Sequence, residues 1–466
     1  MQKRYLLLIL LIVLLTGGGC ATFYQKTMAV QKDIADGNFE SALKSLERDK
    51  KWPQNNHRVL YFMNKGVVHF MLGEHEASNA WFDRADLYIE DYRKNIGFEA
   101  LALVSNPMVR PYRPEDFEAI MVHYYKALNF IALGNFEGAL IECRRINLLL
   151  LAFNENYKEH KNKYTRDAFA HNLMGLVYQA AGDYNNAFIA YRNALEIYES
   201  DYQSLFGLQA PRQLKLDLLY TARMTGFHEE VLRYEKAFGL KTPEVQEGYG
   251  DLVYLWMNGL GPVKSEWSLN LTNMGVRNGA MLFGSDELGI TFPLHLGQQQ
   301  SNQAAAFKNL SFIRMAFPRY LERQPLYHSA VLRSNQESYS LEMAQNVNKI
   351  AHQSLKDRML REMGNNLLRL ATKQVMEQAT RRENENLGAL VGIVNAMTEK
   401  ADTRNWQSLP YALHYTRVPL PAGEQKLMLE QQGLSGTQRD TVEVNIQPGR
   451  TLFQIYHQLG STAPRQ

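Results

Sequence analysis

Apolar and small residues recur at helical spacing between residues 172 and 198, the most regular stretch of the chain. Gly182 interrupts the pattern and predicts a turn between two helices, because glycine readily adopts the left-handed conformation in which helices end. Gly175 and Ala187 are small enough to let those two helices pack closely. The pattern therefore predicts a helical hairpin whose apolar face is covered by a neighbouring element.

Weaker copies of this unit align on other glycines that would turn between helices, namely Gly37, Gly73, Gly134 and Gly226. The unit at 172–198 is the most complete one and carries, in order, Met174, Gly175, Tyr178, Gly182, Tyr184, Ala187, Tyr191 and Ala194. This order resembles the tetratricopeptide (TPR) repeat, and the resemblance extends over roughly residues 28 to 240. It implies a curved array of helix pairs. The turn glycines are 36 to 61 residues apart, more than the regular spacing of about 34, so insertions separate the pairs.

TPR arrays bind extended peptides or partner helices on the concave face formed by their first helices. The resemblance assigns to this face, as candidate partner-binding residues, Leu60, Met63, Val67, Tyr124, Leu128, Asn172, Leu176 and Gln179. The face lacks the set of Lys, Arg and Asn side chains with which known TPR grooves grip a C-terminal carboxylate. A groove this apolar fits a hydrophobic peptide or a partner helix. It also fits the C-terminal half of the same chain, and both occupants stay open here.

After residue 243 the hydrophobic pattern changes. A β-prone run at 252–257, a glycine-rich turn at 258–262 and an alternating run at 263–271 predict a hairpin. Helical periodicity then returns and predicts one or two long amphipathic helices over 346–382. A short, nearly all-apolar helix is predicted at 387–397, where burial in a core is favoured because so short a helix cannot cross a bilayer.

Alternating runs dominate the end of the chain. Those at 441–447 and 451–456 flank a Pro-Gly pair and predict a hairpin within a small β-sandwich-like module. The expected fold class is therefore α+β and multidomain: an all-α TPR-like array, then a mixed α/β region, then a β module. The boundaries that follow are a signal peptide at 1–19, the array at 20–240, a mixed domain with long amphipathic helices at 241–404, and the β module at 405–466.

Three segments extend the resemblance. Residues 258–264 (Asn-Gly-Leu-Gly-Pro-Val-Lys), residues 401–406 (Ala-Asp-Thr-Arg-Asn-Trp) with Leu409-Pro410, and residues 418–423 are similar to a group of Gram-negative TPR-containing outer-membrane lipoproteins of this length. That group has no settled activity. The similarity therefore implies architecture and leaves the function open.

The N-terminus predicts export and lipid attachment. Lys3 and Arg4 precede a short apolar run and a small-residue approach to Cys20, the order that a secretory signal requires. The approach resembles the lipobox of bacterial lipoproteins, although Gly17 stands where Leu is usual. The mature chain would begin with a diacylated Cys20. Because Ala21 rather than an acidic residue follows, the expected location is the periplasmic face of the outer membrane.

Charge and cysteine content narrow the possible partners. The formal net charge of +3 falls to +1 once Lys3 and Arg4 are removed with the signal, which predicts no polyanion and no nucleic-acid partner. Cys143 is the only other cysteine, so an acylated Cys20 leaves no intrachain disulfide. Its apolar neighbours predict a small buried side chain rather than a reactive thiol.

No catalytic or metal-binding motif is complete. Residues 258–264 hold two glycines and a lysine but lack the P-loop spacing, and proline with flanking strands favours a turn. Ser41 and Lys44 match a serine–lysine motif, but the Ser-Asp-Asn and Lys-Thr-Gly companions are absent. The histidines show no ligand spacing. We therefore expect no cofactor and no metal.

These observations favour a non-enzymatic, lipid-anchored periplasmic scaffold that binds an unidentified envelope protein through its repeats. In one alternative the partner is a cell-wall synthase that the chain activates. In another the chain assists assembly of envelope polysaccharide or surface fibres. A third, from a different class, is a wall-modifying enzyme with its site in 250–400.

Overall fold

The computed structural model describes residues 23–94 apart from 49, 51 and 55, then 110–156, 161–277, 280–285, 290–295, 312–334, 337–359 and 401–465. Three sequence predictions therefore lie outside the described residues: the signal at 1–19, lipidation of Cys20, and the helix at 387–397. Of the helix predicted over 346–382, the described part is helical from 347 to 359. No helix among the described residues is long and apolar enough to cross a membrane.

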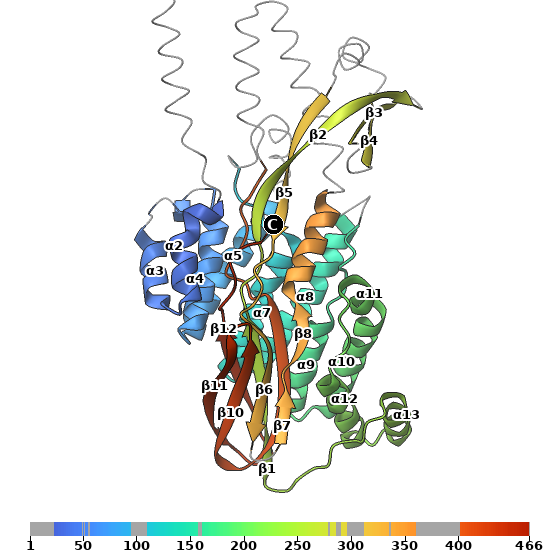
Figure 1. Cartoon of the computed structure of the whole chain (residues 1–466). Helices are drawn as coiled ribbons and strands as arrows, with labels where there is room; N and C mark the ends of the chain where they lie inside the picture. The colour runs from blue at the N-terminus through green and yellow to red at the C-terminus, as the bar shows by residue number, and fades with distance from the viewer. Residues whose placement is uncertain are drawn as a thin grey trace, which may run out of the picture.

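The described first half forms successive helix pairs, as the repeat pattern predicts (Figure 1). The pairs are α2 (Phe23–Ala35) with α3 (Phe39–Arg48), α4 (Arg58–Met71) with α5 (His75–Lys94), α7 (Asp116–Ala132) with α8 (Phe136–Asn156), α9 (Ala168–Ala180) with α10 (Tyr184–Ile197), and α12 (Arg212–Met224) with α13 (His228–Phe238). Shorter turns are η1 (Trp52–Gln54), the π-helical η4 (Tyr198–Tyr202) and α11 (Gln203–Phe206).

Glycine ends the first helix of every pair. The five predicted turn glycines all have φ between 70° and 80°. At Gly73 the bonds are those of a Schellman motif: its N–H donates to the carbonyl of Phe70, and the next N–H donates to that of His69. Close packing also follows the prediction, because a Cβ on Gly175 would lie 2.3 Å from the Tyr191 ring. The helical-repeat character of the first half is confirmed.

The described strands of the second half form three four-stranded sheets. Their bounds are β1 (Tyr249–Asn258), β2 (Val263–Arg277), β3 (Ala280–Ser285), β4 (Ile290–His295), β5 (Phe312–Leu321), β6 (Tyr327–Ser334), β7 (Glu337–Ser340), β8 (Glu342–Asn346), β9 (Ala412–Pro421), β10 (Gly423–Gly433), β11 (Gly436–Ile446) and β12 (Thr451–Gln458). The strand orders are β12-β1-β9-β8, β11-β10-β6-β7 and β4-β3-β2-β5.

The predicted strands are present, but both predicted hairpins are wrong. β1 does not pair with β2; it lies between β9, which is antiparallel to it, and β12, which is parallel to it from Asp251↔Thr451 to Asn258↔Gln458. β11 pairs with β10 rather than with β12. Strand pairing is set by the tertiary arrangement, and a turn-like sequence between two runs only permits a hairpin.

The first two sheets pack face to face and form a β-sandwich. Leu252 and Trp256 of β1 share a core with Leu332 of β6 and Leu429 of β10. The sandwich-like fold is thus present, but not as a separate module at 405–466. Both sheets combine strands from before and after residue 404, so the predicted 404/405 boundary runs through them.

The other face of the first sheet packs against the helices. Val253 and Leu255, which alternate with the sandwich-facing residues of β1, belong to the core that the helix pairs contribute. On β9, Leu413 and Tyr415 join that core. β1 is consequently buried on both faces, and the helical array, the first sheet and the second sheet form three layers.

The third sheet forms an arm. β2 and β5 pair from Val263↔Leu321 to Thr272↔Phe312, and β3 and β4 continue the sheet from the distal part of β2. Figure 1 shows this arm continuing past the ends of the helices on the side away from the sandwich. We refer to β2–β5 as the arm.

Candidate functional site

The concave face of the helical array is filled by the chain's own first sheet. The candidate partner-binding residues are all buried there: Leu60, Met63, Val67, Tyr124, Leu128, Asn172, Leu176 and Gln179. Phe70 packs edge-on against His457 of β12 with ring centroids 5.0 Å apart, and the Tyr415 hydroxyl donates to Asn172 at 3.4 Å. Of the two occupants left open by the sequence, the structure shows the chain itself. The assignment of these residues to an open partner-binding groove is therefore corrected, because all of them are buried and the array shares its core with the first sheet and residues 406–409.

Polar contacts join the sheet to the array at two further places. Asp167 accepts hydrogen bonds from the Tyr124 hydroxyl at 2.6 Å and from the Gln345 amide of β8 at 3.0 Å. Arg417 of β9 donates to Asp217 of α12 at 2.8 Å. Burial raises the pKa of Asp217, against the lowering effect of Arg417. These contacts hold the sheet against the face on which a TPR array would bind a peptide.

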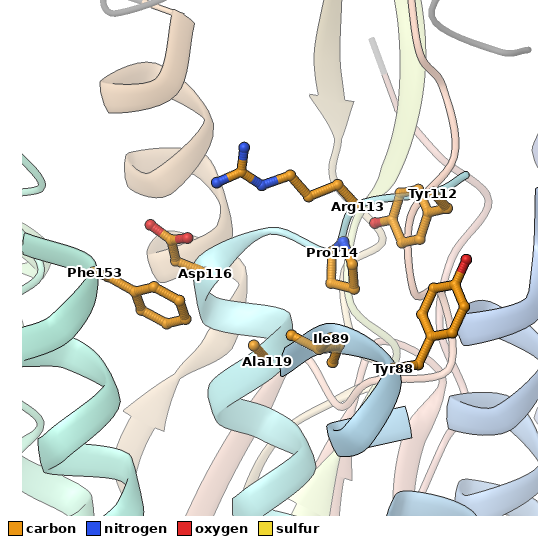
Figure 2. A pocket seen from close by; sticks show the side chains of 8 residues that line it. All are labelled: Tyr88, Ile89, Tyr112, Arg113, Pro114, Asp116, Ala119 and Phe153. Atoms are coloured by element: carbon orange, nitrogen blue, oxygen red, sulfur yellow. The ribbon is translucent and has the colours of Figure 1, made fainter. Parts of the chain in front are cut away.

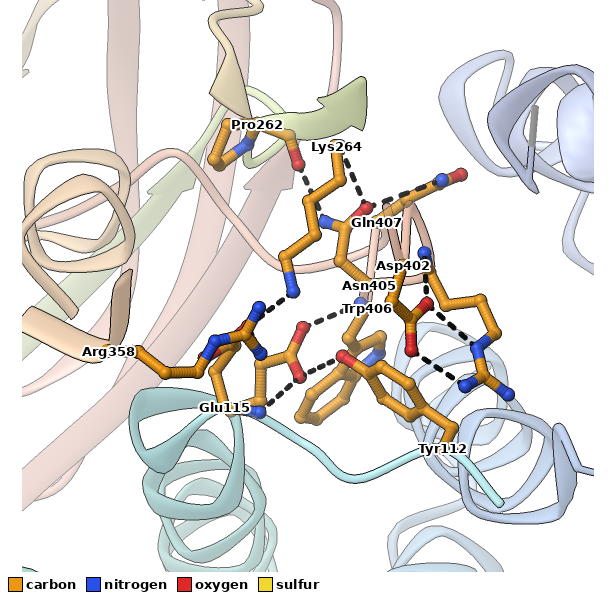
Figure 3. Close-up of polar contacts among 11 residues, drawn as sticks. Tyr112, Glu115, Pro262, Lys264, Arg358, Asp402, Asn405, Trp406 and Gln407 are labelled. Carbon is orange, nitrogen blue, oxygen red and sulfur yellow. Dashed lines mark hydrogen bonds and ion pairs between the residues drawn. The ribbon is translucent and has the colours of Figure 1, made fainter. Parts of the chain in front are cut away.

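A cluster of buried charges lies where the array, the arm and the 401–409 segment meet (Figure 3). We call it the junction cluster, and it comprises Tyr112, Glu115, Glu118, Lys264, Arg358, Asp402, Arg404 and Trp406. Two segments named in the resemblance come together here. The Asn405 side chain accepts from the Lys264 N–H at 3.1 Å and donates to the Pro262 carbonyl at 2.8 Å.

Glu115, at the start of α7, is the centre of the cluster. Its carboxylate pairs with Lys264 and, at 2.6 Å, with Arg358. The side chains of Glu115 and Lys264 are only 3% and 1% exposed. Burial alone would raise the pKa of Glu115, but the charges of Arg358 and Lys264 outweigh it and lower that pKa. The pair is therefore charged and shielded from solvent, the situation in which losing one partner costs most.

Glu118 lies one turn further along α7 and binds neutral donors. Its carboxylate accepts from the Glu115 backbone N–H at 2.9 Å, from the Trp406 N–H at 2.7 Å and from the Tyr112 hydroxyl. Acceptance from Glu115 is one half of a capping box and satisfies a free donor of the helix start. Burial raises the pKa of Glu118 and also that of Tyr112.

Arg404 ties the same segment to the loops before α4 and α7. It pairs with Asp402 at 2.6 Å and donates to the carbonyls of Asn56 and Arg110 at 3.1 and 2.8 Å. Although burial opposes it, the pKa of Asp402 is lowered by this pairing. The guanidinium carbon lies 5.4 Å from the Tyr112 ring centroid. Arg404 thus holds three stretches that are distant in sequence, at 402–404, 56 and 110–112.

Chemically, the junction cluster is a structural connector. Glu115 pairs with Lys264 and Arg358, Asp402 pairs with Arg404, and Glu118 accepts from neutral donors. Sequence reasoning noted Lys264 only within a glycine-containing turn and did not find Glu115 or Glu118. Their only signal is an acidic first turn in a helix, and nothing in the sequence relates that turn to a lysine on a distant strand.

A recess opens beside the cluster (Figure 2). Ile89, Ala119 and Phe153 give it an apolar lining, and Arg113 and Asp116 add one charge of each sign. The remaining lining residues are Tyr88, Tyr112 and Pro114. Asp116 already accepts from Asn162 at 2.6 Å.

The outer surface of α8 carries exposed apolar side chains. Ile141, Leu148 and Leu151 are 45%, 64% and 56% exposed. Helical geometry places Ile141 and Leu148 on one line and Leu151 on the next. The same helix supplies Phe153 to the recess. We call these three residues the α8 stripe.

The other residues considered from sequence have ordinary positions. Cys143 is fully buried, which raises the pKa of its thiol, as expected for a packing residue. The Ser41 hydroxyl donates to Asp33 at 3.0 Å. Residues 258–264 join two strands, as predicted, and do not precede a helix. Within the described ranges, no three His, Cys, Asp or Glu side chains are grouped closely enough to hold a metal ion.

No family model matches the sequence, and no curated protein matches it significantly. Several solved structures match in part. The apo form of RapI is 15% identical over 46% of this chain and 68% of its own, with a TM-score of 0.33. BtubC (BKLC) from P. vanneervenii is 14% identical over 48% and 83%, with a TM-score of 0.32. MamA from Desulfovibrio magneticus RS-1 is 15% identical over 45% and 88%, with a TM-score of 0.29. At TM-scores this low the folds do not superpose as wholes.

Proposed function

We propose that the protein is a non-enzymatic scaffold, anchored through a lipidated Cys20 to the periplasmic face of the outer membrane, that binds an envelope protein on its outer surface. One observation carries the proposal: the concave face of the array is occupied by the chain's own sheet. The helices therefore form a prebuilt body, and a partner contacts the surface that remains. On that surface the α8 stripe exposes three apolar side chains, with Arg144 and Arg145 between Ile141 and Leu148, and Phe153 of the same helix lines the recess.

Exposed apolar side chains grouped in this way are typical of protein contact surfaces. Leu148 and Leu151 are exposed, so docking of a partner would remove their apolar surface from water. The groove residues are already buried and have little such surface left to lose. The partner we expect therefore presents an apolar helix or loop rather than a free C-terminal carboxylate.

In-cell photocrosslinking tests the surface. A photoreactive residue at Ile141 should give one discrete protein adduct, and the combined Leu148→Asp and Leu151→Asp changes should abolish it. Leu232→Asp is the matched control, because Leu232 is also exposed, at 68%, but lies on α13. This control variant should leave the adduct intact. Loss of the adduct in both variants, or an adduct from Tyr124 instead, would contradict an outer-surface site.

The anchor is tested separately. Cys20→Ser should leave the protein unprocessed or release it to the soluble periplasm, read by signal-peptide cleavage and by fractionation. A membrane pool unchanged in both amount and processing would overturn lipid attachment. The protein that is crosslinked to position 141 then shows whether the partner is a cell-wall synthase or a component of an assembly system.

A further inference from the structure

We infer that the arm is a second membrane contact, whose tip at Met274 and Val276 enters the lipid surface to which the chain is anchored. The inference rests on the lipid anchor of the proposed function. It adds a defined orientation of the protein on the membrane, which a lipid at Cys20 alone would not impose. Four structural observations lead to it.

The arm is rigidly attached at its base. Val263, Phe317 and Tyr320 are buried where β2 and β5 leave the body. Lys264 is paired with Glu115 in the junction cluster, and Glu266 accepts from the Ala401 N–H at 2.7 Å. Each contact holds the start of β2 against a different part of the chain. The direction of the arm is therefore set by the body.

The base of the arm lies at the anchored end of the array. Phe23, which begins α2, stacks on His57 at 5.5 Å, and the neighbouring Asn56 carbonyl accepts from Arg404 of the junction cluster. The first residue of the described chain and the base of the arm are therefore linked through one cluster. Cys20 precedes Phe23 by three residues.

The arm is longer than the segment that joins Cys20 to α2. Three residues span at most roughly 10 Å, so acyl chains on Cys20 hold the lipid surface close to the start of α2. From Lys264 to Val276 the strand β2 extends about 40 Å at the usual rise per residue. Figure 1 shows it continuing past the helix ends. An arm this much longer than the tether, starting from the same end, meets the lipid surface.

The tip has the chemistry for that contact. A β-bulge between Asn273 and Gly275 leaves Met274 as an extra residue outside the ladder. Met274 and Val276 are 49% and 58% exposed. Arg277 is the only Lys, Arg, Asp or Glu in the strand residues 272–277, 280–285 and 290–295, and Asp286 and Glu287 follow β3 in the sequence. One arginine beside exposed apolar side chains suits an anionic headgroup region, where its stem stays among acyl chains and its charge among phosphates.

Site-directed fluorescence tests the contact. The lipidated full chain carrying Val276→Cys is labelled with an environment-sensitive dye and reconstituted into vesicles of phosphatidylethanolamine and phosphatidylglycerol. Cys143 is buried and Cys20 acylated, so the dye reports position 276. Leu232→Cys is the matched control on α13. The dye at 276 should be quenched by doxyl-labelled lipid and shielded from aqueous iodide, and the dye at 232 should show the reverse.

The outcomes separate the arm from the anchor. Co-flotation of the protein with the vesicles reports the anchor, whatever the dye shows. A floating protein whose 276 dye is as open to iodide as its 232 dye would overturn the arm contact and leave the anchor standing. A 276 dye shielded from both quenchers would indicate self-association of the arm and would also overturn it. Changing Met274 to Asp in the labelled Val276→Cys protein should restore iodide access without loss of flotation.

Discussion

Breaking the Glu115–Lys264 pair should destabilise the whole protein. Glu115→Gln leaves the buried Lys264 ammonium without its main partner, and a buried charge left unpaired typically costs about 3–5 kcal/mol. Lys264→Met should cost nearer the lower figure, because Arg358 still pairs with Glu115 at 2.6 Å. The double variant exchanges a charged pair for a nearly neutral one. It should cost less than the two single changes together by roughly 2 kcal/mol.

The matched control is an exposed pair on the second sheet. Lys426 and Glu443 are 2.8 Å apart, with side chains 76% and 64% exposed. Glu443→Gln should therefore change the free energy of unfolding by less than about 1 kcal/mol, the usual value for a surface pair. The two Glu→Gln changes share the same chemistry, so their difference isolates burial.

Denaturant unfolding of the purified chain provides the measurement. Helical circular dichroism follows the array, and fluorescence follows the five tryptophans, of which Trp256 is buried in the sandwich and Trp406 in the junction cluster. Because the array and first sheet share one core, Glu115→Gln should shift both signals together. A Glu115→Gln effect as small as that of Glu443→Gln, or full additivity of the Glu115 and Lys264 changes, would refute the view that this pair holds the halves together.

Three further outcomes follow from single positions. Gly175→Ala places a Cβ 2.3 Å from the Tyr191 ring and should lower the free energy of unfolding by roughly 1–3 kcal/mol, measured by the same denaturation; an unchanged midpoint would argue against the close helix contact. Burial lowers the pKa of His457 to about 3, so the unfolded state binds the proton more readily and stability falls as pH drops from about 6.5 toward 3. His457→Phe, which keeps a ring against Phe70, should recover about 2 kcal/mol at pH 5 relative to pH 7.5, and parallel pH profiles for the two proteins would contradict this. Cys143 should react with a thiol reagent only as fast as the chain unfolds, and rapid labelling of the native protein would show that its site is open.

The local sequence determined much of the helical half. Gly73 and Gly182 end helices at the predicted turns because a left-handed residue is required there, and Gly175 is small because an aromatic ring lies against it. Such signals are local: the residues that carry them are close along the chain. The strand runs of β1, β2, β11 and β12 were visible as well, since alternation and β-branched residues do not depend on which strand lies alongside, whereas β3, β4, β6, β7 and β8 were not predicted.

The tertiary structure alone decided what those elements contact. An apolar helix face shows that something covers it, but the same face fits a partner's peptide and the chain's own β1 equally well. β12 pairs with β1 across most of the second half because backbone hydrogen-bonding groups are alike in every strand, so the neighbour is selected by overall packing. Glu115 and Lys264 are 149 residues apart, and neither has a sequence environment that indicates the other. Periodicity determines which side of an element avoids water; only the folded arrangement supplies what it is buried against.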